Sequence, residues 1–364
     1  MLTIDGAYGE GGGQILRTTL TLAAMLNRPV RIKNIRANRK NPGLAAQHLT
    51  AVRAAAAVCQ ADLSGDQLKS TELIFKPRTS PTPGVYRFDV TEARTGGSAG
   101  AATLVFQTIF LPLALAPGAS QVTIRGGTHV PWSPPFHYLR DVYLPLVAGL
   151  GLQAEVTLSA WGWYPAGNGE IKADIPGRPP ESKLQFGPPI AAILRSERGA
   201  LKQVKGLAVA SSLPAHIAQR IRNRAVNVLT QHGLRAAIEP HLARSDSPGA
   251  GIFLTAEYEF SRAGFAALGE KGKPSERVAD EAVNALLAFH QSQAVLDAHL
   301  ADQLILPVAL SGQPVALRVE RLTPHALTNL WVVEQFLGPV AQVEPERNII
   351  RFKNGELPTE GLWL

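Results

Sequence analysis

The sequence contains almost no cysteine. Cys59 is the single cysteine in 364 residues, so the chain cannot form an intramolecular disulfide. No CxxC pair is present that would hold a structural zinc ion. These absences exclude disulfide-stapled secreted scaffolds and zinc ribbons, and we expect a reducing, cytoplasmic location.

Long apolar runs are also missing. No window reaches the roughly 18 uninterrupted apolar residues that a membrane-spanning helix needs. The first residues, MLTIDGAYGEGGG, lack the basic segment followed by an apolar stretch that is typical of a secretory signal. We therefore expect neither secretion nor contact with a membrane.

Charged residues make up only 18% of the chain, whereas apolar residues make up 45%. This composition excludes global disorder, and the length fits two domains or a repeat architecture. The net charge is +7, and the first 60 residues contribute most of it, with eight basic against two acidic side chains. Such a segment attracts a polyphosphate or a nucleic-acid backbone, but a solvated basic face without a ligand has the same composition.

The hydrophobic periodicity repeats along the chain. The first copy is strand, helix, strand, helix, strand, strand, over residues 2–4, 14–26, 30–35, 44–58, 72–75 and 85–90. The second copy follows a glycine turn and covers residues 99–115, 121–125, 136–150, 154–158 and 170–175. The third copy covers residues 275–290, 314–320, 326–337, 340–343 and 349–352. We therefore expect an α+β fold of three related units.

The stretch of residues 180–265 interrupts these copies. It opens with the proline-rich GRPPES, carries the loop SDSPGAG and contains its own helix at residues 214–233. These features are typical of a small inserted domain. Its helix holds Arg220, Arg222 and Arg224, which suit a phosphate backbone or equally a solvated helix face.

A glycine-rich turn, GAYGEGGGQ at residues 6–14, directly precedes the first helix. Free backbone N–H groups and the helix dipole make such a turn a phosphate cradle, although a glycine turn is also a common tight connection. The glycine spacing does not match the dinucleotide fingerprint, and no GxxxxGK[ST] motif occurs. Nicotinamide enzymes and P-loop ATPases are therefore disfavoured.

A second phosphate-binding candidate is the segment IRANRKNPGLAAQHL at residues 35–49. It sets Arg36, Arg39 and Lys40 in a loop before Gln47 and His48. Arginine forks match phosphate oxygens, whereas the alternative is again a solvated basic loop. The glycine turn and Arg17 are the elements that would complete a phosphate site.

Two further segments contain candidate functional residues. RGGTHVPWSPPFHYL, at residues 125–139, combines prolines and aromatics that suit stacking on a nucleobase or simply cap a core. LTPHALTNL, at residues 322–330, places His325 directly after Pro324 at an expected helix start. The helix dipole there lowers the pKa of the imidazole and keeps it neutral and nucleophilic, as phosphoramidate chemistry requires. A structural role is the alternative for a lone histidine.

Together these motifs resemble the RNA 3′-terminal phosphate cyclase family. The resemblance rests on DGAYGEGGGQILRTTL, IRANRKNPGLAAQHLTAV, GSAGAATLVFQT, GGTHVPWSPPFHYL, YPAGNGE, HLADQLILP and TPHALTNLWVVEQFL, in family order. It implies three repeated βαβαββ units that form a large domain, with a small inserted α/β domain. The expected boundaries are residues 1–179 for repeats one and two, 180–265 for the insert and 266–364 for repeat three.

The resemblance implies an ATP-dependent ligase that forms a phosphoric ester bond. His325 would take AMP from ATP, pass it to an RNA 3′-phosphate to give RNA(3′)pp(5′)A, and the neighbouring 2′-OH would then close a 2′,3′-cyclic phosphodiester and release AMP. The expected partners are ATP, a divalent Mg or Mn ion and RNA with a 3′-phosphate end. Every motif matched to ATP lies outside the insert, so the insert is expected to be dispensable for the step with ATP.

The resemblance also assigns site residues. The expected nucleophile is His325, and the expected metal or phosphate-side carboxylate is Glu10. The expected phosphate or RNA ligands are Arg17, Arg36, Arg39 and Gln47. The residues expected around the adenosine are Gln107, Pro134, Tyr138, His299, Leu300, Ala301, Asp302 and Gln303. The chain departs from the family pattern in two places, because His299 replaces a common tyrosine and His137 a common acidic residue.

Three other functions share some features with this sequence. A non-catalytic, cyclase-like ribosome-assembly protein shares the fold but lacks the histidine, so His325 argues against it. An enolpyruvyl transferase is built from similar repeats and binds phosphorylated substrates without a covalent histidine. A lysine-adenylating ligase is disfavoured because the chain has no KxDG motif.

Overall fold

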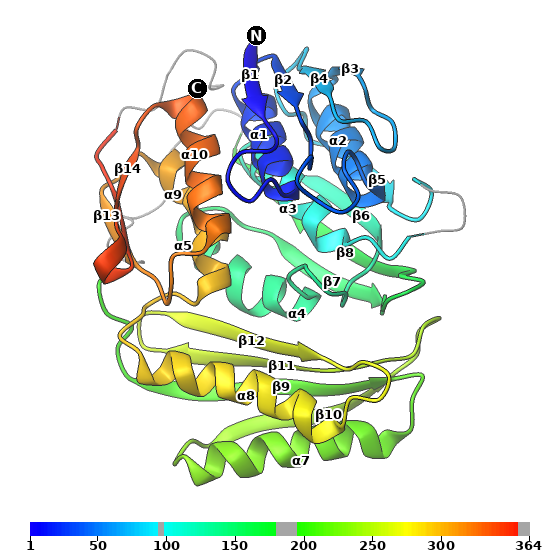
Figure 1. The fold of residues 1–364 in the computed structure, drawn as a ribbon, viewed down its shortest axis with the longest axis vertical. Coiled ribbons are helices and arrows are strands. Elements are labelled where there is room, and N and C mark those ends of the chain that lie inside the picture. The colour runs from blue at the N-terminus through cyan, green and yellow to red at the C-terminus, as the bar shows by residue number, and fades with distance from the viewer. Residues whose placement is uncertain (94–97, 180–194, 356–364) are drawn as a thin grey trace.

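The computed structural model describes residues 1–93, 98–179 and 195–355. Its upper part holds three small sheets with their helices, and its lower part holds one larger sheet with two helices (Figure 1). The expected boundary at residue 180 lies outside the described residues.

The first repeat forms a four-stranded sheet in the order β1-β2-β4-β3. Its first four elements are β1 (Leu2–Asp5), α1 (Gly13–Met25), β2 (Val30–Lys33) and α2 (Ala46–Cys59), and its last two are β3 (Asp62–Ser64) and β4 (Leu73–Lys76). β1 and β2 are parallel, whereas β4 runs antiparallel to both β2 and β3. Alternate strand residues such as Ile32 and Phe75 are fully buried, so one face of the sheet packs on the helices.

The second repeat has the same strand order, β5-β6-β8-β7. Its elements are β5 (Val85–Asp89), α3 (Ala102–Ala114), β6 (Ser120–Gly126), α4 (Phe136–Tyr138), the π-helix η1 (Leu139–Tyr143), α5 (Leu144–Gly149), β7 (Glu155–Ala160) and β8 (Gly169–Ile175). The expected strand at 85–90 therefore opens this repeat and does not close the first one, because β5 pairs in parallel with β6. The strand that belongs in the first repeat, β3, was missed because it has three residues and none is buried.

The third repeat consists of α9 (Ala298–Ser311), β13 (Val315–Arg318), α10 (Pro324–Leu337), β14 (Ala341–Glu344), the 3₁₀ turn η2 (Pro345–Arg347) and β15 (Ile349–Phe352). Its sheet order is β13-β15-β14, and a parallel bridge between Leu296 and Val319 stands where the other repeats have their first strand. The expected βαβαββ pattern is thus complete in two repeats, and in the described residues the third repeat has a single bridge in place of the first strand.

The lower sheet has the order β10-β9-β11-β12. It is formed by β9 (Leu201–Ser211), β10 (Ala236–Ala243), β11 (Gly249–Tyr258) and β12 (Arg262–Leu268), with the helices α7 (Ala215–Gln231) and α8 (Ser275–Gln291). Along β11 the side chains alternate: Ile252 and Leu254 join the core under the two helices, whereas Phe253 belongs to a separate hydrophobic cluster with Trp163 of the second repeat. Both faces of this sheet are therefore covered.

Helix α8 corrects the expected third repeat. The helix at 275–290 was assigned to that repeat, but α8 packs with α7 on the lower sheet. Helix α9 takes its place as the first helix of repeat three. The buried core of the lower unit reaches from Val204 to Ala294 and so continues past residue 265, where the insert was expected to end.

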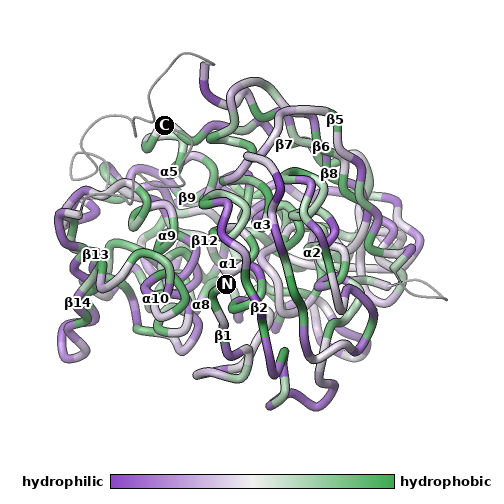
Figure 2. Tube along the Cα trace, turned by 90° about the horizontal axis from the view of Figure 1, so that it is seen from above, coloured by the Kyte–Doolittle hydropathy of each residue, from purple (hydrophilic) through white to green (hydrophobic). Residues whose placement is uncertain are grey.

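One large hydrophobic core joins the three repeats, and α1, α2, α3, α9 and α10 pack on one another within it. Viewed from above, the helices α2 and α3 carry mainly hydrophobic residues, and hydrophilic residues gather at the edges near β13 and β14 (Figure 2). Among the described residues, no helix is long and apolar enough to cross a membrane.

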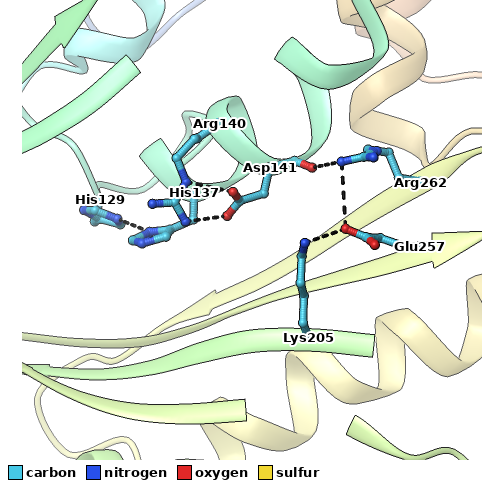
Figure 3. Close-up of polar contacts among 7 residues, drawn as sticks. All are labelled: His129, His137, Arg140, Asp141, Lys205, Glu257 and Arg262. Atoms are coloured by element: carbon cyan, nitrogen blue, oxygen red, sulfur yellow. Dashed lines mark hydrogen bonds and ion pairs between the residues drawn. The ribbon is translucent and has the colours of Figure 1, made fainter. Parts of the chain in front are cut away.

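Polar contacts tie the second repeat to the lower sheet (Figure 3). Arg262 donates from Nη1 to the backbone carbonyl of Asp141 at 3.0 Å and lies 3.9 Å from Glu257, which also pairs with Lys205. Beside them, His129 Nε2 lies 2.9 Å from His137 Nδ1 in a buried hydrogen bond.

Candidate active site

The candidate site begins with a contact between a histidine of the third repeat and a carboxylate of the first. Thr323 caps α10 by accepting a hydrogen bond from the backbone N–H of Ala326 at 3.0 Å, and Pro324 is the first helical residue. This start directs His325 at the glycine turn, where its Nδ1 lies 2.9 Å from Oε2 of Glu10. The His325 side chain remains 46% exposed and is therefore accessible to a substrate.

The glycine turn lies directly against α10. Gly9 has a φ of +54°, and a Cβ at this position would lie 2.5 Å from Oγ1 of Thr328. Both the left-handed backbone and this close approach require glycine. The next residue, Glu10, donates from its backbone N–H to the same Thr328 oxygen at 3.4 Å. The turn thus fixes the position of the Glu10 carboxylate beside His325.

Positive charge surrounds this pair. Arg39 binds the second carboxylate oxygen of Glu10, and its Nη2 would lie 3.0 Å from a Cβ built on Gly12. Burial lowers the pKa of His325, Arg17 and Arg39 lower it further, and only Glu10 acts in the opposite direction. The imidazole is therefore neutral at pH 7.

Arg17 and Asp302 are two further buried ionisable groups at the site, and each affects the pKa of the other. Burial lowers the pKa of Arg17 to about 10, although the Asp302 carboxylate opposes this shift. Burial raises the pKa of Asp302 to about 8, against the effect of Arg17. Arg17 also donates to the side-chain oxygen of Gln14 at 2.7 Å, which orients its guanidinium at the start of α1.

Asn329 joins the three helices that form the site. This buried side chain donates to the backbone carbonyl of Asp302 on α9 at 2.6 Å and accepts from the hydroxyl of Thr18 on α1 at 2.6 Å. Gln14 donates to Thr18 in turn at 3.1 Å. The network sets α1, α9 and α10 relative to one another, and it was not among the expected site features.

The basic segment at residues 35–49 contains Arg36 and Gln47, and each of these side chains has a hydrogen-bond partner in the protein. Arg36 adopts a φ of +54° and donates from Nη1 to the carbonyl of Gly43 at 2.8 Å. Burial lowers its pKa, and Arg39 adds to this shift. Gln47 accepts a hydrogen bond from the backbone N–H of Ala101 at 2.9 Å and so links α2 to the start of α3.

The residues expected around the adenosine divide into two groups. Gln107 of α3 donates to the side-chain oxygen of Gln303 at 2.7 Å, and Gln303 donates to the backbone carbonyl of His299 at 3.0 Å. In contrast, the side chains of Leu300 and Ala301 are fully buried in the large core and offer no exposed surface to a ligand.

Tyr138 lies below the surface of the site, whereas Pro134 is only partly buried. The Tyr138 hydroxyl donates to Oδ1 of Asp297 at 2.7 Å, and burial raises its pKa well above the ordinary value. The carbonyl of Pro134 accepts from the Thr103 hydroxyl at 2.8 Å. Tyr138 therefore supports α9 from behind, whereas Pro134 contacts α3 through its carbonyl and keeps part of its surface exposed.

Two residues near the site were not assigned a role from the sequence. Asp297 caps α9 by accepting from the N–H groups of His299 at 3.0 Å and Leu300 at 2.9 Å; an aspartate before an amphipathic run was the available signal. His48 is buried beside Arg17 and Gly13, and burial, then Arg36 and Arg17, lowers its pKa to about 3. The basic segment was noted for both Gln47 and His48, but only Gln47 was assigned a role, because periodicity alone does not reveal which side chain faces inward.

This geometry suits attack by nitrogen on a phosphate. The neutral tautomer that carries its proton on Nδ1, the atom 2.9 Å from Oε2 of Glu10, leaves the lone pair of Nε2 free for a substrate. Arg17, Arg39 and the free N–H groups at the start of α1 provide positive charge for an anion. Within residues 1–93, 98–179 and 195–355, no three histidine, cysteine or acidic side chains form a metal cluster.

Comparison with known proteins shows relatives that match most of this chain. A family model described as RNA 3′-terminal phosphate cyclase matches residues 8–343. A protein of Gloeothece citriformis described by the same words is 52% identical over 336 residues, covering 92% of this chain and 93% of that protein. Proteins with this description from Methylococcus capsulatus, covering 92% of this chain, and Ignicoccus hospitalis, covering 94%, are 53% and 41% identical. The matched regions span 91% of the Methylococcus protein and 94% of the Ignicoccus protein.

Proposed function

The chain belongs to the RNA 3′-terminal phosphate cyclase family of ligases, and on this premise we propose that it cyclises RNA 3′-phosphate ends through a histidine–AMP intermediate on His325. The family acts on RNA and uses ATP as co-substrate. The observation that carries the proposal is the neutral imidazole held by Glu10 between Arg17 and Arg39.

In the first step, Nε2 of His325 attacks the α-phosphorus of ATP. A P–N bond forms, the bond to the β-phosphate oxygen breaks, and pyrophosphate leaves. The proton stays on Nδ1, where the Glu10 carboxylate stabilises the positive charge that develops on the ring. Arg17 and Arg39 bind the phosphate oxygens and balance their negative charge.

In the second step, an oxygen of the RNA 3′-phosphate attacks the phosphorus of the histidine adenylate and breaks the P–N bond. The product, RNA(3′)pp(5′)A, now carries AMP as a leaving group, which a phosphate monoester lacks. In the third step the neighbouring 2′-OH attacks the 3′-phosphorus, loses its proton, and AMP departs. The 2′,3′-cyclic phosphodiester remains on the RNA.

The metal requirement belongs to the same proposal. Mg²⁺ commonly binds one or two carboxylates together with substrate phosphates, and Mn²⁺ accepts the same oxygen ligands. Glu10 is the carboxylate that faces His325, so the residues fit an ion held mainly by the triphosphate. When bound, such an ion neutralises phosphate charge.

The other expected residues are assigned either to phosphate or RNA binding or to the adenosine. We assign Arg36 and Gln47 to phosphate or RNA binding, and Gln107, His299, Asp302 and Gln303 to the adenosine. For Leu300, Ala301 and Tyr138, the burial and contacts described above favour support of the adenosine site over direct contact, whereas the partly exposed Pro134 is assigned to the adenosine. A non-catalytic role is disfavoured by His325, and an enolpyruvyl transferase by the family match. A cytoplasmic location remains part of the proposal.

The test is incubation with ATP labelled in the α-phosphate, without RNA, followed by denaturing electrophoresis. Label that is released by acid and retained in alkali is expected on the wild type and lost in His325→Ala. His216→Ala is the matched control, because His216 is likewise the second residue of its helix, after Pro214. Labelling that persists in His325→Ala would contradict the assignment.

A further inference from the structure

An aromatic pair lies beside the candidate nucleophile. Tyr8, in the glycine turn, stacks on Trp331 of α10 with ring centroids 3.9 Å apart and an angle of 12° between the ring planes. No role in the chemistry described above uses either ring. The pair is formed by the same two segments that bring Glu10 to His325.

The position of the pair is fixed by neighbouring contacts. Gly9 and Glu10, which follow Tyr8, both contact Thr328. His325, Thr328 and Trp331 are spaced three residues apart, so they lie along one side of α10. Six residues of helix correspond to about 9 Å along the axis. The stacked rings are therefore within the reach of one nucleotide from the imidazole.

The two rings differ in how they are held. Trp331 is partly buried and packs against the large core. Tyr8 is 44% exposed, although Trp331 covers one face of its ring. Trp331 thus fixes the orientation of Tyr8, and Tyr8 presents aromatic surface to solvent at the edge of the site. A flat, preoriented ring with exposed surface is the usual platform for an unstacked base.

The adenosine residues lie in another direction from α10. Asn329 points from α10 toward α9 and binds the carbonyl of Asp302, and α9 in turn meets α3 through Gln303 and Gln107. Tyr8 and Trp331 instead lie where α10 meets the glycine turn. The reaction requires two nucleotides near His325, and these two regions provide a separate place for each.

We propose that the Tyr8–Trp331 stack binds the 3′-terminal nucleobase of the RNA and so positions its phosphate beside His325. This inference rests on the proposed function. Stacking on a ring accepts every base, because each has a π face, so the stack adds affinity for an RNA end without selecting its sequence. Basic residues then hold the terminal phosphate.

The experiment measures the RNA KM and the labelling by ATP alone in three variants at position 8. Tyr8→Leu retains apolar packing on Trp331 but removes the aromatic face. Tyr8→Phe retains the aromatic face and removes only the hydroxyl. We expect Tyr8→Leu to raise the KM for a 3′-phosphorylated RNA about 5- to 100-fold, as loss of one base stack does. Tyr8→Phe and the exposed-surface control Tyr164→Ala should leave it unchanged, and all should label normally. Tyr8→Ala should raise the KM at least as much as Tyr8→Leu.

An RNA that lacks its terminal base supplies the decisive comparison. The wild type should bind this abasic RNA as weakly as Tyr8→Leu binds normal RNA, and the mutation should then have no further effect. An unchanged RNA KM in Tyr8→Leu, or an equal loss on normal and abasic RNA, would overturn the proposal. Reduced labelling by ATP with normal RNA binding would instead assign the stack to adenine.

Direct binding separates this proposal from the proposed function. Fluorescence anisotropy of a dye-labelled, 3′-phosphorylated RNA without ATP reports affinity whether or not the protein forms an adenylate. Loss of affinity in Tyr8→Leu would support the stack even if His325 never accepted AMP. Absence of labelling in the wild type would refute only the histidine–AMP chemistry.

Discussion

Glu10 and His325 belong to the first and third repeats, and their side chains meet at 2.9 Å between Oε2 and Nδ1. The glycine turn fixes one partner and the Thr323 cap fixes the other. Because neither repeat contains both groups, the candidate nucleophile is oriented only when the repeats pack together. The first prediction follows from this pair.

Glu10→Gln should lower the rate of histidine adenylylation about 10-fold or more, because it removes the charge that stabilises the attacking imidazole. Glu10 raises the pKa of His325. Its removal should therefore lower that pKa and move the acidic limb of the pH–rate profile to lower pH. Single-turnover labelling across pH measures both effects, with the exposed Glu155→Gln as control. An acidic limb that stays in place or moves upward would argue against this coupling.

Arg39→Ala should weaken substrate binding. The guanidinium lies beside Glu10 and the start of α1, where a phosphate would meet the backbone N–H groups. Loss of one charge-assisted contact costs about 1.5 to 3 kcal/mol, so we expect the KM for ATP or RNA to rise at least 10-fold. Arg53→Ala is the matched control, since Arg53 lies in the same basic segment but pairs with Asp66 at 3.6 Å. Equal KM values in both variants would indicate a merely solvated patch.

Much of this architecture was predictable from the sequence because its signals are local. The glycine turn, the Pro324 helix start and the 3.6-residue periodicity of α1 and α2 each lie within one segment. Pairing between distant strands is not local. The assignment of β5 to the first repeat and of α8 to the third failed because strand partners and packing faces depend on residues far away in the sequence.

The candidate site shows the same limit. His325, Glu10, Arg17 and Arg39 were expected from motifs, and the structure brings them together. The Asn329 network was not expected, since its partners Thr18 and the Asp302 carbonyl come from two other helices. The paired arginines of α7 were also beyond sequence patterns, because Arg220 and Arg224 bind Glu276 and Asp280 of α8. These ion pairs favour a structural role for the two arginines over contact with RNA.

The buried pair His129 and His137 predicts a loss of stability in acid (Figure 3). Burial, then Arg140, lowers the pKa of His137 to about 4, although Asp141 opposes the shift; burial and His137 lower the pKa of His129 further. The folded state therefore stays neutral while the unfolded chain takes up protons below about pH 6.5. Stability should fall as pH decreases from about 7 toward 4.

His137→Phe tests this dependence. The ring of His137 stacks on Phe253 at 4.9 Å, so phenylalanine fits the aromatic surroundings. Between pH 7 and pH 5 the variant should lose about 2 kcal/mol less unfolding free energy than the wild type, because one titrating group has gone. Urea unfolding at both pH values measures the difference, and exposed His241→Phe serves as control. Parallel pH dependence in wild type and His137→Phe would refute the assignment.

The last prediction concerns the lower unit, which was expected to be dispensable for the step with ATP. The structure connects this unit to the site through Gly264 of β12. Its backbone N–H donates to Oδ2 of Asp297 at 3.1 Å, and a Cβ there would lie 2.6 Å from the Tyr138 ring. Asp297 also accepts from Tyr138 and caps α9, the helix that carries Asp302. A substitution in the lower sheet should therefore alter the position of α9 and of the adenosine residues that it carries.

Gly264→Ala should displace Tyr138 and loosen the cap of α9, which raises the KM for ATP in the labelling reaction several-fold or more. The measurement needs no RNA, so an effect on RNA binding cannot imitate it. Ala266→Ser, at an exposed position of the same strand, should label as the wild type does. Circular dichroism and the urea midpoint identify a variant that merely unfolds; Gly264→Ser, with a Cβ at the same point, then provides a second test. If folded Gly264 variants bind ATP normally, the lower unit does not support the ATP site, and its expected dispensability for that step stands.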